Sequence, residues 1–320
     1  MKNDPLVSIC CITYNHSNYI RESIESFLNQ KTSFLFEICI GEDQSDDETR
    51  EICQDYAQKY PGSIRLFLRS RNDVIYVNGL PTGRYNMVET LKQCRGKYIA
   101  ICEGDDYWCN PRKLQQQYDF LEKDKLVGVF GKSIIYNGTS FKNIKYPFIS
   151  SNDNKNIIID YDKLPYEQWL FAHTSTFFFK RSIIDDYIFL PGNNNKLFYE
   201  ICKSGRVGFI NDNLSVYRKH IGGNSKQRGI NKELNYQHYY QNYLFFNELK
   251  VKSNVLKKQI RYMYNYYIIL LIGSPANITF IQKFCAIVYF LLLIDSNHYL
   301  RNIKLIKRRL SSTIFHGGKW

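Results

Sequence analysis

The sequence predicts an α/β fold, with a doubly wound, mostly parallel sheet and a helical extension at its C-terminal end. Between Leu6 and Tyr118, short apolar runs alternate with longer amphipathic segments, which is typical of strand–helix units in a parallel sheet. Polar and acidic residues directly follow several of these runs, and such sheets bind ligands at their strand ends. From about Asn231 the pattern becomes helical and aromatic. We therefore expect two domains, residues 1–228 and residues 229–320.

Strand–helix units account for the first part of the chain. Each strand is expected where a short apolar run is bounded by polar loop residues. In the first helix, Ile20, Ile24 and Phe27 recur at helical spacing and give it one apolar face. Ser45 or Asp46 is expected to cap the second helix. The predicted strands are residues 7–12, 36–40 and 64–68, and the predicted helices are residues 19–29, a segment ending near residue 59, and residues 86–94.

A fourth apolar run ends in a cluster of acids. Residues 96–102 predict a buried strand, and Glu103, Asp105 and Asp106 follow it within four residues. Carboxylates this close repel one another unless a cation or a hydrogen-bonding ligand lies between them. An amphipathic helix then opens near Asn110. The cluster indicates a divalent metal that holds a phosphate group.

The pattern is less regular after residue 126. Further strands are expected at residues 127–131 and 174–179, and a later pair at residues 207–210 and 214–217. Residues 137–165 are polar and rich in Asn and Lys, which predicts a loop.

The charge distribution limits the partners of the chain. Its net charge is +13, but residues 250–320 carry twelve Lys and Arg residues against one acid, which leaves the first 249 residues at +2. A nearly neutral main domain argues against nucleic acid as its substrate.

The cysteines and the N-terminal residues indicate a cytoplasmic setting. The nine cysteines form no CxxC pair and no disulfide framework, so we expect buried, reduced thiols. Residues 1–5 lead directly into the first predicted strand without the pattern of a signal peptide.

Three predicted strand ends carry polar side chains. Because successive strand ends lie along one edge of a parallel sheet, these groups are expected to converge. One acid can accept a hydrogen bond from a base N–H, another from ribose hydroxyls, and a third can bind Mg²⁺ or Mn²⁺, which prefer carboxylate and phosphate oxygens. The three groups are Thr13, Tyr14 and Asn15; Glu42 and Asp43; and Glu103, Asp105 and Asp106.

In order along the chain, these segments resemble family 2 glycosyltransferases, which have the Rossmann-like, nucleotide-sugar-binding GT-A fold. The resemblance covers roughly residues 5–225. Residues 173–175 and 217–223 are similar to the acceptor-side strand and the closing His-Gly-Gly segment of these enzymes. The other matching residues are 7–15, 42–49 and 96–108, followed by Pro111, Lys113 and Leu114.

The resemblance implies a role for each matching residue. Glu42 and Asp43 match the acidic pair that contacts the nucleotide base, with Glu where Asp is usual. Asp105 and Asp106 match the acids that hold the ribose and the metal-bound diphosphate. His220 is expected near the diphosphate, and its alternative role is to cap a helix or a turn. The expected nucleotide-sugar-binding residues are Thr13, Tyr14, Asn15, Glu42, Asp43, Arg84, Glu103, Asp105 and Trp108, and the expected metal ligands are Asp105, Asp106 and His220.

One position departs from the family pattern. Similar enzymes place an acid, the general base, about eleven residues before a Gly-containing turn, and counting back from Gly205 gives Asn194. An amide is no base near neutral pH, and losing a general base lowers the rate by about 10²–10⁴-fold. Three explanations stay open. A shifted register makes Glu200 or Asp185/Asp186 the base, catalysis proceeds without a dedicated base, or the chain is inactive.

The basic C-terminal region has two interpretations. Residues 266–272 and 284–294 are apolar, and both are shorter than the ~20 residues that span a bilayer. Basic clusters frame them, which favours peripheral binding to an anionic cytoplasmic membrane face at about 1 kcal/mol per basic residue. The alternative is a helical subdomain that packs its apolar face on the first domain.

The sequence and the resemblance together predict a metal-dependent, inverting glycosyltransferase. It is expected to move a sugar from a nucleotide-diphosphate donor to a hydroxyl of a bacterial surface glycan, such as lipopolysaccharide, or of its lipid-linked precursor. The alternative is an inactive nucleotide-sugar-binding protein or partner subunit, which Asn194 motivates. A nucleotidyltransferase is not favoured, because the N-terminal segment lacks a Gly-rich, basic phosphate loop.

Overall fold

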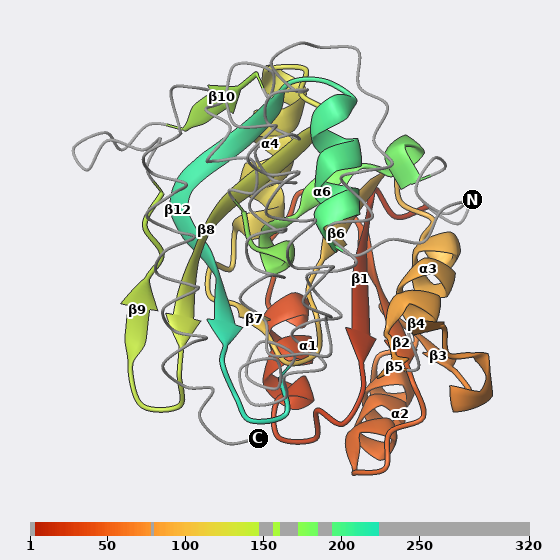
Figure 1. Ribbon diagram of the computed structural model, residues 1–320. Helices are drawn as coiled ribbons and strands as arrows, with labels where there is room; N and C mark the ends of the chain where they lie inside the picture. Colours follow the sequence, from red (N-terminus) through yellow and green to blue (C-terminus); the bar gives the residue numbers. More distant parts are fainter. Residues whose placement is uncertain (1–3, 78–79, 147–155, 161–171, 185–193, 224–320) are drawn as a thin grey trace, which may run out of the picture. The chain divides into compact units, whose positions relative to one another are not determined.

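Parallel strands form the N-terminal half of a central ten-stranded sheet (Figure 1). β1 lies between β2 and β6, and β2 also pairs with β3. The register sets Thr13, the last residue of β1, opposite Glu42, the last residue of β2. The carboxyl ends of these strands therefore share one edge of the sheet. The strands are β1 (Val7–Thr13), β2 (Phe36–Glu42), β3 (Ile64–Leu68) and β6 (Tyr98–Ile101).

The second half of the sheet is mixed. Its strands are β7 (Tyr107–Trp108), β8 (Gly128–Tyr136), β9 (Phe141–Asn143), β10 (Ile157–Ile159), β11 (Phe178–Lys180) and β12 (Val207–Arg218). β11 is antiparallel to both β6 and β8, whereas β12 is parallel to β8. The order across the sheet is β10-β12-β8-β11-β6-β1-β2-β3, with β7 paired to β12 and β9 to β8. A separate small ribbon pairs β4 (Tyr76–Val77) with β5 (Leu80–Pro81).

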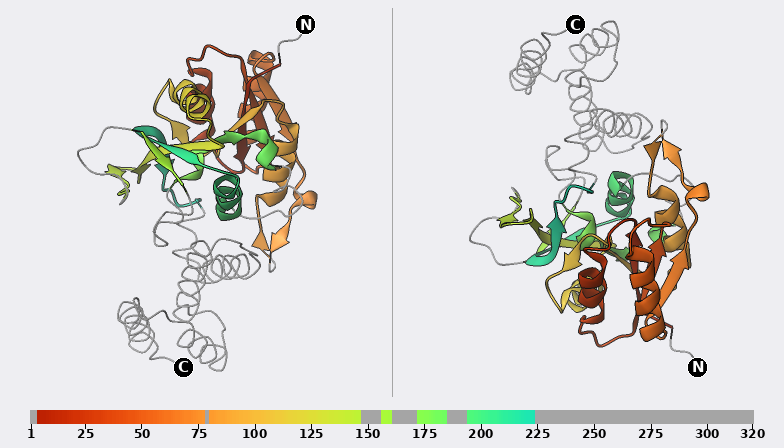
Figure 2. Two further views of the ribbon diagram at one scale, coloured as in Figure 1. Left: turned by 90° about the horizontal axis from the view of Figure 1, so that it is seen from above. Right: turned by 90° about the horizontal axis from the view of Figure 1, so that it is seen from below.

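Helices cover both faces of the sheet, as a doubly wound fold requires. They are α1 (Ile20–Leu28), α2 (Thr49–Lys59), α3 (Arg84–Gln93), α4 (Lys113–Lys123) and α6 (Asn194–Lys203). Figure 2 shows α1, α2 and α4 on one face and α3 and α6 on the other. The predicted α/β class and doubly wound sheet are confirmed.

β1 is buried on both faces, which explains its nearly continuous apolar sequence. Ile9 belongs to the core cluster that also contains Ile24 and Phe27 of α1. On the opposite face, Cys10 Sγ lies 3.9 Å from Met87 Sδ of α3. A fully buried Ile or Phe side chain stabilises the fold by about 1.5–3 kcal/mol, so this strand anchors the loop that follows it.

The structure is a computed structural model, and it describes residues 4–77, 80–146, 156–160, 172–184 and 194–223. These residues belong to one unit, formed by Met1–Leu164 and Leu170–Gly223. The predicted C-terminal region, residues 229–320 with its two apolar segments, lies outside the described residues. Asp185 and Asp186 lie outside them as well. No helix within the described ranges is long and apolar enough to cross a membrane.

Several predicted elements differ from the observed ones. The predicted strand at residues 174–179 begins as a 3-10 turn, Thr174–Thr176, because the hydroxyl and N–H of Thr176 both donate to the His173 carbonyl. The predicted pair at residues 207–217 is one strand, β12, with register shifts between Ile210 and Ser215. The predicted loop at residues 137–165 contributes β9 and β10.

The predicted cap of α2 is wrong, because the residue before the helix is Glu48 and its side chain makes no capping hydrogen bond. The Thr49 N–H donates instead to Asp47 Oδ1 at 3.0 Å, and neither Ser45 nor Asp46 accepts it. The eight cysteines among the described residues are free thiols, and seven of them are buried.

Candidate functional site

The acids after β6 lie on a tight turn that glycine and serine position. The Gly104 N–H donates to the Ile12 carbonyl at 2.9 Å, which holds the turn against the end of β1. A Cβ at Gly104 would lie 2.6 Å from Thr13 Oγ1, so this close approach requires glycine. The Ser23 hydroxyl of α1 donates to the carbonyl oxygens of Gly104 and Asp106. The turn is therefore fixed from both β1 and α1.

Asp105 lies at the centre of a cluster with two histidines. Its Oδ2 is 3.1 Å from His220 Nε2 and 3.8 Å from His16 Nε2. One ligand atom from each of these three residues lies within 4.8 Å of the other two. Within the described part of the chain, Asp105 Oδ1 is buried and has no hydrogen-bond partner. Carboxylate oxygen and imidazole nitrogen both bind divalent metals, so these residues fit a divalent cation.

The pKa values of the two neighbouring aspartates shift in opposite directions. Burial alone would raise the pKa of Asp105, but the hydrogen bond with His220 and the charge of His16 hold that pKa below its ordinary value. Burial raises the pKa of Asp106 well above its ordinary value, and the charge of Asp105 raises it further. A cation beside the pair would favour the ionised form of both carboxylates.

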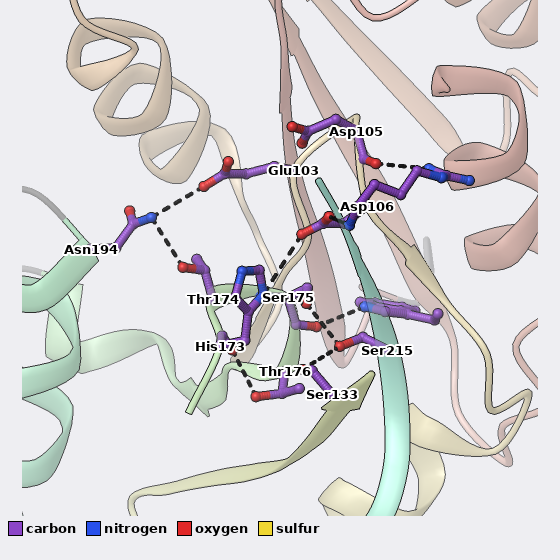
Figure 3. A network of polar contacts seen from close by, with 12 residues as sticks. Glu103, Asp105, Asp106, Ser133, His173, Thr174, Ser175, Thr176, Asn194 and Ser215 are labelled. Carbon is purple, nitrogen blue, oxygen red and sulfur yellow. Dashed lines mark hydrogen bonds and ion pairs between the residues drawn. The ribbon is translucent and has the colours of Figure 1, made fainter. Parts of the chain in front are cut away.

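Asp106 is buried between β12 and His173. Its Oδ1 accepts the main-chain N–H of Arg218 at 2.9 Å, and its Oδ2 lies 3.7 Å from His173 Nδ1 (Figure 3). A chain of hydroxyls continues from His173, because its Nδ1 is 2.8 Å from Ser175 Oγ, which is 2.8 Å from Ser215 Oγ. The Asp106 carboxyl is therefore held by main chain on one side and by a polar chain on the other.

Arg218 fixes the segment that carries His220. Its guanidinium donates to the Asp105 carbonyl at 2.8 Å, forms an ion pair with Glu22 of α1, and lies 4.4 Å from the centre of the Tyr107 ring. The side chain is 6% exposed. The end of β12 is thereby tied to the acid turn, and His220 follows two residues later.

Glu103 points away from Asp105 and Asp106 towards α6 (Figure 3). Asn194, the first residue of α6, donates through Nδ2 to Glu103 Oε1 at 3.1 Å and to Thr174 Oγ1 at 3.0 Å. The structure thus places Asn194 beside an acid of the cluster.

Glu200 occupies another side of α6. It lies six residues after Asn194, which is about 240° further around an α-helix. Its carboxylate pairs with Lys203 Nζ at 2.6 Å. Asp185 and Asp186, the other predicted alternatives, lie outside the described residues, so their role stays a prediction.

The two acids at the end of β2 are candidates for different roles. Glu42 is a structural candidate, and Asp43 is a candidate for binding a ligand. Both Glu42 oxygens are occupied, because the carboxylate accepts the N–H groups of Gln44 and Ser45 at 3.2 and 2.7 Å and pairs with Arg50. Asp43 Oδ2 accepts from Arg71 at 2.7 Å, but Asp43 Oδ1 is buried without a hydrogen-bond partner among the described residues. Burial raises the pKa of Asp43 although Arg71 opposes this.

The loop after β1 is joined to the loop after β2. Asn15, with a φ of 55°, donates from its N–H to Ser45 Oγ and accepts the Asp46 N–H at its side-chain oxygen, both at 2.9 Å. The Tyr14 hydroxyl donates to Asp46 Oδ2 at 3.1 Å, and the Arg71 guanidinium lies 4.2 Å from the Tyr14 ring centre. Tyr14 therefore offers an aromatic surface close to Asp43.

Arg84 and Trp108, which were also predicted to bind the nucleotide sugar, lie at the margin of the groups described above. Arg84 is the first residue of α3, and the preceding Gly83 faces Ile12 near the end of β1. Trp108 is buried against Phe27, and its indole N–H donates to the Ser175 carbonyl at 2.9 Å. Their predicted contacts with a donor stay predictions.

The structure adds residues that the sequence pattern did not single out. His16 joins the Asp105 cluster because it follows the β1 loop directly, and this adjacency to Asn15 was the available signal. Arg71 reaches Asp43 from the segment after β3, and Arg218 reaches Asp105 from β12. The partners of both contacts lie far apart in the sequence, so a local sequence pattern does not predict them.

Comparisons with known proteins agree with this geometry. The model of glycosyl transferase family 2 matches residues 8–188, which is more than half of the chain. An uncharacterized protein of Mycobacterium bovis is 30% identical over 223 residues, which cover 68% of this chain and 60% of that protein. The minor teichoic acid biosynthesis protein GgaA of Bacillus subtilis is 28% identical over 225 residues, which cover 67% of this chain and 47% of that protein. The chain thus spans about 60% or less of the length of these curated relatives.

A solved structure shares the fold. TarS of S. aureus in complex with UDP-GlcNAc superposes with a TM-score of 0.58 at 15% identity, covering 98% of this chain and 93% of that one. This likeness confirms the predicted fold, and the family match confirms the predicted family. The chain therefore belongs to glycosyl transferase family 2.

Proposed function

We propose that this chain is a metal-dependent, inverting glycosyltransferase that uses a nucleotide-diphosphate sugar as donor. One observation carries the proposal. The ends of β1, β2 and β6 bring Tyr14, Asp43 and Asp105 to one edge of the sheet, and His220, which follows β12, contacts Asp105 there. This arrangement supports a base site at Asp43 and a diphosphate and cation site at Asp105.

Asp43 and Tyr14 are proposed to bind the nucleobase. Asp43 Oδ1 is a buried acceptor without a hydrogen-bond partner among the described residues, and leaving such an acceptor unsatisfied costs about 1–3 kcal/mol. An N–H on the edge of a base would satisfy it. The Tyr14 ring supplies a surface on which a base can stack, at about 1–3 kcal/mol.

Asp105, His16 and His220 are proposed to hold the cation, with Asp106 beside them. The mixed oxygen and nitrogen set suits Mn²⁺ better than Mg²⁺, which prefers oxygen ligands and bound water. A bound cation supplies charge neutralisation for the leaving diphosphate. A solved neighbour, mannosyltransferase PcManGT from Pyrobaculum calidifontis in complex with GDP-Man and Mn²⁺, superposes with a TM-score of 0.52 at 11% identity.

The proposed acceptor is a hydroxyl of a cell-wall glycan or of its lipid-linked precursor. GgaA, a teichoic acid biosynthesis protein, supports this class over the lipopolysaccharide expected from the sequence. The excess of Lys and Arg in residues 250–320 supports a site at the cytoplasmic face of an anionic membrane.

A second candidate function is nucleotide-sugar binding without turnover. The amide of Asn194, at the position where the resemblance places the general base, favours it. Donor binding with no release of nucleoside diphosphate from any donor would establish this candidate.

Calorimetric titration of the full chain with UDP and GDP, with Mn²⁺ and with EDTA, tests the donor and cation sites. We expect binding of at least one nucleotide that weakens in EDTA and in Asp105→Asn. Asp55→Asn, an exposed change on α2, is the matched control and should bind as the wild type does. Binding that is indifferent to both EDTA and Asp105→Asn would overturn the proposed cation site.

A further inference from the structure

We propose that the turn between β8 and β9, together with the segment after β12, docks on an anionic phospholipid surface. Five residues define this docking surface: Tyr136, Phe141, Lys142, Lys219 and Ile221. It is distinct from the basic residues 250–320, because it belongs to the unit that carries the acid turn. The inference rests on the proposed function in one respect, since a lipid-linked acceptor gives such a surface its purpose.

Contacts between β8, β9 and β12 make the docking surface continuous. Tyr136 and Phe141 are opposite each other in the β8–β9 pair, and their ring centres are 4.8 Å apart. Lys142 follows Phe141 on β9. The Lys219 N–H donates to the Tyr136 carbonyl at 2.7 Å, which sets the segment after β12 beside the same hairpin. Ile221 follows two residues later, so the surface joins two distant parts of the sequence.

The docking surface lies at the edge of the sheet that holds the acid turn. β11 is antiparallel to both β6 and β8, so β8 runs in the direction of β6, and β12 is parallel to β8. Figure 1 shows the turn after β8 and the end of β12 at the end of the sheet to which the arrow of β1 points. A lipid leaflet at this surface therefore lies beside the site to which a lipid-linked acceptor must come.

Large apolar side chains are exposed on the docking surface. Phe141 is 57% exposed, and Ile221 is 72% exposed. Single exposed apolar side chains are common on protein surfaces. These two share one surface with lysines, and aromatic and aliphatic side chains beside basic ones are typical of segments that enter the boundary between headgroups and acyl chains.

The charges on this surface have one sign. Residues 128–146, which contain β8 and β9, carry three lysines and no acid, and residues 213–223 carry Arg218 and Lys219 and no acid. Lys142 and Lys219 are both exposed. Glu22 reaches the end of β12 from α1, and its carboxylate is paired with Arg218. This charge matches an anionic leaflet, which attracts basic residues near its surface.

The turn between β8 and β9 satisfies its own polar groups. Asn137 Oδ1 accepts the N–H groups of Thr139 and Ser140 at 3.1 and 2.9 Å, and the Asn137 N–H donates to the Ser140 carbonyl. The Gly138 carbonyl accepts the Tyr136 hydroxyl at 2.9 Å. Contact with lipid removes water from a turn, and polar groups without partners oppose that step. These internal hydrogen bonds lower the cost of bringing the turn to the lipid.

Quenching of tryptophan emission by brominated lipid tests the contact directly. Phe141→Trp places a reporter on the docking surface. Leu35→Trp is the matched control, because Leu35 is 55% exposed and precedes β2 at the opposite edge of the sheet. The wild type gives the background of the chain's three tryptophans. Each full chain is titrated with vesicles of phosphatidylglycerol and brominated phosphatidylcholine, and with vesicles of brominated phosphatidylcholine alone.

Excess quenching is expected for one variant on one kind of vesicle. With the anionic vesicles, Phe141→Trp should lose more emission than the wild type, and Leu35→Trp should lose no more than the wild type. The phosphatidylcholine vesicles should quench neither variant beyond the wild type. Because bromine on an acyl chain quenches only by close approach, this readout separates insertion from charge attraction alone.

A charge reversal tests the basic part of the surface. Lys142→Glu should weaken binding to the anionic vesicles by about fivefold or more, which is the factor that one basic residue contributes near such a leaflet. Lys123→Glu is the matched control, an exposed change at the end of α4 shortly before β8 begins, and should bind as the wild type does. Without vesicles, both variants should release nucleoside diphosphate from a soluble donor at the wild-type rate.

Several outcomes would overturn the inference. Vesicle binding without excess quenching at position 141 would do so, as would no vesicle binding at all, or equal losses in Lys142→Glu and Lys123→Glu. A change in the emission of Phe141→Trp with protein concentration alone would identify a second copy of the chain as the occupant instead. No turnover of any donor by the wild type would overturn the proposed function, whereas excess quenching in that case would leave the lipid contact standing.

Discussion

The main-chain N–H of Arg218 donates a hydrogen bond to Asp106 Oδ1 at 2.9 Å, although 112 positions separate the two residues. This bond joins the end of β12 to the acid turn after β6. The same residue's guanidinium donates to the Asp105 carbonyl, so backbone and side chain together hold the segment that leads to His220. The position of His220 therefore depends on Arg218.

Arg218→Ala should destabilise the protein and weaken nucleotide binding. The change removes a buried side chain with an ion pair to Glu22, and Glu22 stays largely solvated, so we expect a loss of about 1–3 kcal/mol in the free energy of unfolding. Urea denaturation measures the loss, and calorimetry with UDP and Mn²⁺ measures the binding. Lys219→Ala, an exposed change one residue later, should alter neither.

His16→Gln should weaken Mn²⁺ binding by about tenfold or more, because it removes one of the three groups around Asp105. Calorimetric titration with Mn²⁺ in the presence of UDP measures the effect. Unchanged affinity would show that His16 is not a ligand, and would favour the set Asp105, Asp106 and His220 expected from the sequence.

UDP should bind more tightly than GDP, and Asp43→Asn should reduce this preference. Asp43 Oδ1 has no hydrogen-bond partner among the described residues, and the Arg71 guanidinium lies beside it. This arrangement matches an edge with a single N–H flanked by carbonyls, as in uracil. Guanine presents two adjacent N–H donors. Loss of a hydrogen bond to a charged group, worth about 1.5–3 kcal/mol, should weaken UDP binding by about 10–100-fold. Tighter binding of GDP would contradict this assignment.

Lys113→Met should flatten the pH dependence of stability. Burial lowers the pKa of Lys113 to about 7, while in the unfolded chain its pKa is about 10.4. Between these values the unfolded state binds more protons, so this group makes stability rise with pH from about 7 to 10.4. The variant lacks the titrating group.

Urea denaturation at a series of pH values measures this slope in wild type and variant. Lys123→Met, an exposed change at the end of the same helix, should keep the wild-type slope. An equal slope in Lys113→Met and wild type would show that Lys113 is protonated in the fold.

The ends of β1, β2 and β6 were predictable to within two residues, because each strand is a short apolar run bounded by polar residues. The same pattern places Gly104 and the acids around it directly after the end of β6. The direction of each carboxylate was not predictable in the same way. Glu103 is oriented by Asn194, 91 positions away, and Asp105 by His220, 115 positions away.

The second half of the sheet was harder to predict for a related reason. β12 includes the polar stretch around Asp212, which resembles a turn between two strands in the sequence. Register shifts against β8 accommodate these residues within one strand. Tertiary pairing thus overrides a local turn pattern.

The decisive measurement is release of nucleoside diphosphate from a panel of UDP- and GDP-sugars, with Mn²⁺ and a range of cell-wall glycan acceptors. We expect release from at least one donor, lost in Asp105→Asn and retained in Asp55→Asn. No release from any donor, or release that survives Asp105→Asn undiminished, would show that this chain is not a metal-dependent glycosyltransferase of the proposed kind.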